Sequence, residues 1–344
     1  FRADVECMND IAEEIIRMYG YDTLATSLPS TSAAMGGRNP HQAYEAFVTD
    51  TLIGFGFDQI HTFSFISPKY YDKIRMPENS PKRKSIRITN PLGEDTSIMR
   101  TIALPSLLEV LAFNYNMKNH GASMFEIAKV YLPKKEDELP DEPSRITLGF
   151  FNVDDKNANE FTKIKGYIET LLSASGIDNV DYVAADGDGA FHPGRCAEIL
   201  CGDTVLGTFG EIHPLTAENY GFGCPVYAAE LDFEALYNAR KTTILYTPIP
   251  KHPAVERDFS FVCDEDVEAG TVAKLIRKAG GATVKDATLF DVYRGAQIGD
   301  GKKSLSFAVK LLSQDHTLTD EEADHTVKKI LDKLASELGI SLRK

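Results

Sequence analysis

The sequence has 344 residues, of which 43% are hydrophobic and 26% charged, so it can form more than one hydrophobic core. It contains no apolar run long enough to cross a membrane, and its five scattered cysteines lack a CxxC pair, which argues against a disulfide framework or a zinc site and predicts a cytoplasmic protein. The net charge of −14 opposes nucleic-acid binding overall. Most of this charge lies in residues 1–249, which carry 22 basic and 35 acidic residues, whereas residues 250–344 carry 15 basic and 16 acidic residues and are nearly neutral.

The first predicted element is an amphipathic helix in DIAEEIIRMYGYD, where Ile11, Ile15 and Met18 recur at helical spacing and a glycine ends the pattern. Because the sequence does not begin with Met, we expect residues 1–26 to be the end of a helical domain that begins upstream. Residues 27–40 are rich in Ser, Thr, Gly and Pro and predict a linker.

Four acidic residues accompany this helix, namely Asp4, Asp10, Glu13 and Glu14. The spacing of the last three places their carboxylates on neighbouring faces of one helical turn, and hard oxygen ligands suit Mg²⁺. Acidic residues in a first helical turn also complement the helix dipole without binding a metal. The residues alone leave both interpretations open, and their spacing favours the helix-dipole explanation.

Helical and strand patterns alternate in residues 41–238. QAYEAFVTDTLIGFGF and PSLLEVLAFNYN predict helices, the second opening with a proline, and QIHTFSFI alternates like a strand. Five further strands follow with short turns, namely SMFEIAKVY, RITLGFFNV, RCAEILC, VLGTFGEI and VYAAELD. This order predicts an α+β domain in which a largely antiparallel sheet carries helices on one side.

No catalytic motif is visible in the sequence. It contains no GxSxG, no HExxH and no Cys/His nucleophile pattern. The spacing of His192, Cys196, Cys201 and His213 matches no common zinc site. We therefore predict no catalytic residue in this chain.

A drop in acidity after IPKHP marks a second domain, residues 250–344. Its segments ERDFSFVC, EAGTVAKLIRKAG, TLFDVYRG, KKSLSFAVKLL, TDEEADHTVKKILDKLASELG and ISLR predict the order βαββαβ of a ferredoxin-like fold. Asp266 is the expected N-cap of the first helix, and Thr319 and Glu322 form a capping-box pattern at the second. The strand KKSLSFAVKLL separates large apolar residues from polar ones, so helices can cover one face and leave the other to bind a ligand.

The segment GAQIGDGKKS resembles a phosphate-binding P-loop, but it has one residue too many between its outer glycines and it joins two strands. We interpret it as a glycine-rich hairpin whose Lys302 and Lys303 can meet a phosphate backbone. Tyr293, Arg294 and, from the first strand, Arg257 suit base stacking and phosphate contact on an exposed sheet. An ordinary solvated turn explains the same residues without RNA, so both interpretations stay open at this point.

Several motifs in one order resemble the C-terminal portion of the β subunit of bacterial-type phenylalanyl-tRNA synthetase, over essentially the whole chain. They are FRADVECMNDIAEEIIRMYGYD, NPLGEDTSIMRTIALPSLLEVLAFN, SMFEIAKVY, HPAVERDFSFV, LFDVYRGAQIGDGKKSLSF and TLTDEEAD. The resemblance implies that residues 1–26 end a helical domain of DNA-binding-like fold. It also implies that residues 41–238 form an inactive class II synthetase-like domain, and that residues 250–344 form a ferredoxin-fold anticodon-binding domain.

By the same resemblance, Mg²⁺ is bound jointly with the α subunit by Asp4, Asp10, Glu13 and Glu14. The α subunit binds ATP and activates phenylalanine, and this chain supports it in an (αβ)2 heterotetramer. The phosphate-clamping arginine of class II enzymes is absent here, because Glu126 follows Phe125 and would repel phosphate. No Glu-Arg pair ends the late segment YGFGCPVYAAELD, so a second clamp is missing as well.

The resemblance further implies that the C-terminal domain binds the anticodon stem and loop of tRNA(Phe). The polar and aromatic residues of its motifs that we expect to contact RNA are Arg257, Asp291, Tyr293, Arg294, Lys302, Lys303 and Ser304. Two alternatives are a single-chain organellar synthetase, which needs the absent clamping arginines, and a stand-alone RNA-binding or regulatory protein. The expected upstream domain and the acidic half-site count against the second alternative.

Overall fold

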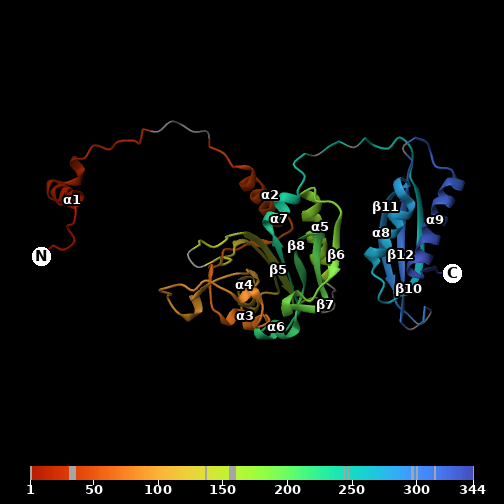
Figure 1. Cartoon of the computed structure of the whole chain (residues 1–344), viewed down its shortest axis with the longest axis horizontal. Coiled ribbons are helices and arrows are strands. Elements are labelled where there is room, and N and C mark those ends of the chain that lie inside the picture. Colours follow the sequence, from red (N-terminus) through yellow and green to blue (C-terminus); the bar gives the residue numbers. More distant parts are fainter. Residues whose placement is uncertain are drawn as a thin grey trace. The chain divides into compact units, whose positions relative to one another are not determined.

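The structure is a computed structural model that describes residues 2–30, 36–135, 138–154, 160–243, 245–246, 248–295, 298–299, 301–313 and 315–343 (Figure 1). It contains two compact units, Phe1–Ala43 and Tyr44–Lys344. Among the described residues, no helix has the length and apolar character needed to span a bilayer.

The first unit contains the predicted amphipathic helix, α1 (Met8–Tyr19), followed by the 3₁₀ turn η1 (Tyr21–Thr23). Gly20 ends α1 with a φ of 108°, a conformation that disfavours residues with a Cβ. The apolar residues Ile11, Ile15 and Met18 are all exposed. The predicted linker lies partly outside the described residues, at positions 31–35.

The second unit begins with a domain built on a mixed seven-stranded sheet of order β1-β4-β5-β9-β8-β7-β6, in which only β1 runs parallel to its neighbour. Its strands are β1 (Asp58–Gln59), β4 (Gly121–Lys129), β5 (Ser144–Asn152), β6 (Val180–Ala184), β7 (Phe191–Cys201), β8 (Thr204–Ile212) and β9 (Val226–Asp232). The five predicted later strands are confirmed. The segment QIHTFSFI is not one strand, because it contains the last residue of β1 and, after a break, the two-residue strand β2 (Phe65–Ile66), which pairs with β3 (Ile98–Met99).

Helices pack on both faces of this sheet, so the prediction that they lie on one side is wrong. One face is covered by α4 (Leu104–Asn116), and the helices on the other are α2 (Pro40–Gly54), α5 (Phe161–Ala174) and α7 (Phe233–Ala239) (Figure 1). The reason is visible in β5, where Phe150 belongs to one core and its neighbour Phe151 to the other. Strands that are apolar on both faces need cover on both.

Short helices complete this domain. They are α3 (Lys69–Lys73), α6 (Pro214–Asn219) and the 3₁₀ turns η2 (Pro81–Arg83), η3 (Glu94–Thr96) and η4 (Gly187–Gly189). Both predicted long helices are present, and a proline stands in the first turn of α4 as expected.

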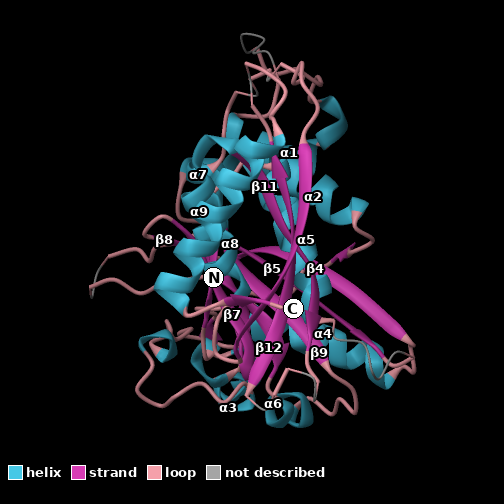
Figure 2. Ribbon diagram, turned by 90° about the vertical axis from the view of Figure 1, so that its right-hand side faces the viewer, coloured by secondary structure: helices cyan, strands magenta, loops and turns pink. Residues whose placement is uncertain are grey.

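The C-terminal domain has the predicted βαββαβ order. Its elements are β10 (Val255–Asp264), α8 (Ala269–Gly280), η5 (Gly281–Thr283), β11 (Val284–Tyr293), β12 (Lys302–Leu311), α9 (Asp320–Leu338) and β13 (Ser341–Leu342). All pairs in the sheet β11-β12-β10-β13 are antiparallel, and its long strands are drawn in magenta in Figure 2. The α+β fold class is therefore confirmed for both domains.

Of the two helix N-caps predicted in this domain, the one of α9 is correct and the one of α8 is wrong. Thr319 caps α9 in a capping box, because its side chain accepts from the Glu322 N–H at 3.3 Å while the Glu322 carboxylate accepts from the Thr319 N–H at 3.0 Å. Asp266 does not cap α8. The residue at the N-cap is Glu268, and Asp266 lies inside a turn closed by the Val267 N–H and the Asp264 carbonyl at 3.2 Å.

Candidate functional site

The two faces of the four-stranded sheet differ as the alternation in β12 predicts. Leu305 and Phe307 point to the helices and are each 1% exposed. The opposite face carries Ser304 and Ser306, which are also buried, and the Ser306 hydroxyl lies 2.9 Å from that of Ser260. Ser304 is thus on the predicted face but not accessible there, so it is removed from the set of expected RNA contacts.

An aromatic–cation pair covers part of this second face. Tyr293 ends β11 opposite Ser304, and the guanidinium carbon of Arg343 lies 5.0 Å from the centroid of the Tyr293 ring. Arg343 follows β13 at the other edge of the sheet, so the pair reaches across the two central strands. Gly295 leaves room for the ring, because a Cβ there would lie 2.5 Å from the Tyr293 hydroxyl.

Two more predicted residues share this face. In the strand register, Asp291 stands opposite Ser306 and Lys302 stands opposite Asp264. Both Asp291 and Lys302 are exposed. Among the described residues, the Lys302 ammonium group has no ion-pair or hydrogen-bond partner. We call the surface formed by Asp291, Tyr293, Lys302 and Arg343 the open face.

Glu265 organises the end of the sheet beside the open face. Its carboxylate pairs with Arg294 at 2.8 Å, and its carbonyl accepts a hydrogen bond from the Lys303 ammonium at 2.7 Å. Lys303 stands opposite Cys263 and so belongs to the helix side of β12, unlike its neighbour Lys302. Arg294 and Lys303 remain at the rim of the open face, but each has a partner within the protein.

Arg257 does not belong to this group. It lies on the helix side of β10, where it pairs with Asp320 at the start of α9 at 3.3 Å. It is also seven residues from Asp264, the strand partner of Lys302, which corresponds to roughly 23 Å along an extended strand. The prediction that Arg257 neighbours Tyr293 is wrong, because it has the same strand parity as the buried Phe259.

The acidic residues of the first unit do not gather around one point. Arg2 pairs with Asp4 at 2.6 Å and with Glu14 at 2.8 Å, and the hydrogen bonds from its guanidinium lower the pKa of both carboxyls. The Asp10 carboxylate accepts the N–H groups of two residues before α1, which lowers its pKa as well. Among the described residues, no three His, Cys, Asp or Glu side chains are placed to hold a metal. The donor chemistry suits Mg²⁺, but this arrangement does not fit the ion.

The predicted phosphate-repelling Glu126 is buried in an ion pair. Both Glu126 and Arg100 are nearly inaccessible, and their charged atoms lie 3.3 Å apart. Glu126 also accepts hydrogen bonds from the N–H and hydroxyl of Thr62, at 2.9 and 2.7 Å. Glu126 is therefore buried and paired with Arg100 and presents no free negative charge at the surface, which corrects the prediction.

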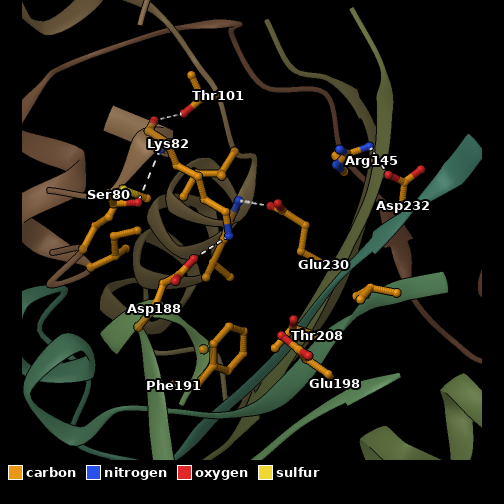
Figure 3. A pocket seen from close by; sticks show the side chains of 18 of the residues that line it. Ser80, Lys82, Thr101, Arg145, Asp188, Phe191, Glu198, Thr208, Glu230 and Asp232 are labelled. Carbon is orange, nitrogen blue, oxygen red and sulfur yellow. Dashed lines mark hydrogen bonds and ion pairs between the residues drawn. The ribbon is translucent and has the colours of Figure 1, made fainter. Parts of the chain in front are cut away.

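The same face of the seven-stranded sheet carries a cavity of about 550 Å³ between β5, β7, β8, β9 and the residues before α4 (Figure 3). Its two basic side chains are already paired, Lys82 with Asp188 at 2.5 Å and Arg145 with Asp232 at 2.8 Å. The remaining charged side chains that line it are acidic. The net negative charge of this cavity would repel the phosphates of a nucleoside triphosphate.

His192 and His213 lie near each other, with ring centroids 6.5 Å apart. Each Nδ1 accepts a backbone N–H, from Gly194 at 3.0 Å and from Leu215 at 3.1 Å. Burial raises the pKa of the Cys196 thiol to about 12, far from the thiolate that binds zinc. The hydrogen bonds of His192 and His213 therefore stabilise the local backbone.

Two domain families match the chain. One, described as the phenylalanyl tRNA synthetase beta chain CLM domain, matches residues 24–233, and the other, the ferredoxin-fold anticodon binding domain, matches residues 250–343. A largely antiparallel sheet with helices on both faces, followed by this ferredoxin-like domain, defines a chain of the aminoacyl-tRNA synthetase class. Within that class, the chain belongs to the phenylalanyl-tRNA synthetase β chain family.

Similar proteins carry the corresponding name. The phenylalanine–tRNA ligase beta subunits of Clostridium acetobutylicum and Geobacter sulfurreducens are 39% and 31% identical, in each case over the whole of this chain. The chain spans 43% and 44% of those two proteins. Among solved structures, a pyrrolysyl-tRNA synthetase from Desulfitobacterium hafniense has a TM-score of 0.47 at 15% identity, covering 67% of this chain and 74% of that one.

Proposed function

We propose that this chain is a non-catalytic part of a phenylalanine–tRNA ligase and that its open face binds the anticodon region of tRNA(Phe). The proposal is supported by the family membership and, in particular, by the Tyr293–Arg343 pair on an accessible sheet face. An aromatic ring next to a guanidinium offers a stacking platform for an unpaired base together with a cation for its phosphate. Lys302, without a partner among the described residues, adds a second phosphate contact.

The catalytic step belongs to another polypeptide in this proposal. ATP and phenylalanine bind to an α subunit, and this chain supports that subunit in an (αβ)2 assembly in the cytoplasm. The charge of the cavity supports this division, because both of its basic side chains are neutralised by acidic partners. No step is assigned to Mg²⁺, since Asp4 and Glu14 share Arg2 and Asp10 is held by backbone N–H groups.

Binding of a labelled tRNA(Phe) anticodon stem-loop tests the proposal by fluorescence anisotropy. We expect Tyr293→Ala to weaken binding by about 1–3 kcal/mol, the usual contribution of one stacked base. Tyr246→Ala is the matched control, because Tyr246 is 81% exposed and lies outside the open face.

Tyr293→Phe should retain most of the affinity, because stacking needs the ring and not the hydroxyl. Equal affinity of the wild type and Tyr293→Ala would remove the open face from the RNA interface. Equal losses in the variants at Tyr293 and Tyr246 would do the same.

A further inference from the structure

The cavity on the seven-stranded sheet has an organised polar floor. Glu198 on β7 pairs in register with Thr208 on β8, which pairs with Glu230 on β9, so the three side chains form one row on the same face. The labelled side chains of this row are visible in Figure 3. The row continues to Thr147, which is fully buried and whose hydroxyl has no hydrogen-bond partner in the described part of the chain.

The carboxylates of this floor are not neutralised by cations. The Glu230 carboxylate accepts the N–H groups of Ala103 and Leu104 at 2.9 and 3.0 Å, which orients it at the start of α4. The Glu198 carboxylate has no hydrogen-bond or ion-pair partner among the described residues. Five acidic residues and two basic residues line the cavity. The two basic residues, Lys82 and Arg145, are each already paired with one of the acidic residues, so the cavity has a net negative charge.

The walls of the cavity are apolar. Ile102, Leu104 and Phe191 line it beside the acidic floor. Glu198 and Glu230 are separated by two strand spacings, roughly 10 Å between their backbones. A cavity of about 550 Å³ falls in the size range of small-molecule sites.

From the cavity, the spacing of the two carboxylates and the apolar walls, we propose that this cavity binds an aliphatic diamine or polyamine. One ammonium group contacts Glu198, a second contacts Glu230, and the methylene chain between them lies against the apolar walls. Anions are disfavoured by the net charge. A bare divalent metal ion is disfavoured because no three acidic, His or Cys side chains of the described residues converge on one point.

Isothermal titration of the 344-residue chain with putrescine and with spermidine tests this site, at about 150 mM salt so that weak surface binding is screened. We expect one saturable site per chain. Butane-1,4-diol, which has the same chain length as putrescine without its charges, should not bind. No saturable binding of either amine, or equal binding of the diol, would overturn the proposal.

Glu198→Gln should weaken amine binding about tenfold, the loss expected for one charge-assisted hydrogen bond. Glu45→Gln is the matched control, because it makes the same charge change at an exposed position of α2, a helix of the opposite face. Equal losses in both variants would show general attraction to an acidic protein and would overturn the site.

Thr208→Val keeps the shape of the floor and removes its hydroxyl. If Glu198→Gln fails to fold by circular dichroism, this variant decides the question. A several-fold loss of affinity supports the site, and unchanged affinity contradicts it.

Discussion

Both sheets of this chain are largely antiparallel, but they differ in whether their basic side chains are paired within the protein. On the seven-stranded sheet, two arginine side chains are neutralised by acidic ones: Glu126 pairs with Arg100, and Asp232 pairs with Arg145. On the four-stranded sheet, Lys302 stays exposed and without a partner among the described residues. Sheet architecture therefore does not decide which domain binds a nucleic acid. In our proposal, the domain that binds RNA is the one that leaves an aromatic and a basic side chain accessible on one sheet face.

The largest effect should come from breaking the internal pairing of the first sheet. Arg100→Ala leaves the Glu126 carboxylate buried without its partner and should destabilise the domain by about 3–5 kcal/mol. Urea unfolding followed by circular dichroism measures this change. Arg17→Ala, which breaks the exposed pair with Glu14, is the control and should cost less than about 1 kcal/mol.

The double variant Arg100→Met with Glu126→Leu should recover much of that stability, because an apolar pair of similar volume needs no charge compensation. Stability of the single Arg100 variant within about 1 kcal/mol of the wild type would contradict the contrast between the two sheets.

A smaller effect is expected from removing cations at the open face. Lys302→Ala should weaken binding of the anticodon stem-loop and reduce the slope of log affinity against log salt by about 0.7, the value for one contact to a single strand. Lys303→Ala should change both quantities less, because its ammonium already donates to the Glu265 carbonyl. Titrations at several salt concentrations measure the slopes. A larger change in the Lys303 variant would reverse our assignment of these two residues.

Sequence patterns predicted the C-terminal domain well because its strands are apolar on one face only. The order of the elements and the alternation in β12 follow directly from that periodicity. The same alternation places Arg257 on the helix side of β10, two residues before the buried Phe259, and the prediction that grouped it with Tyr293 did not apply it. Arg343 was missed for a different reason, since its contact with Tyr293 reaches across the sheet and exists only once β11 and β13 have taken their places at its two opposite edges.

The same limit applies to the first sheet. Glu126 was identified from its place beside Phe125, but its partner Arg100 lies 26 positions earlier and nothing in the local pattern connects the two residues. The cavity likewise depends on strand register, which brings Glu198 and Glu230 into one row. Contacts between distant segments therefore had to come from the structure.

The smallest effect concerns pH and the start of α9. The Thr319 N–H and the neighbouring His316 lower the pKa of Glu322 below its usual 4.5. Because the folded-state pKa is depressed, this stabilisation is present above about pH 4.5 and is lost as the pH falls through the folded value. Glu322→Gln should therefore flatten the acid side of the stability profile of the C-terminal domain. A profile identical to the wild type between about pH 3 and 5 would contradict this role.

Hydrogen–deuterium exchange of the chain with and without tRNA(Phe) tests the central claim most directly, because it reports on both sheets in one experiment. We predict that RNA slows exchange in Val284–Tyr293 and at residues 341–343, the two edges of the four-stranded sheet that carry the open face. The strands Phe191–Cys201, Thr204–Ile212 and Val226–Asp232 should exchange unchanged. Protection confined to those three strands would contradict the account.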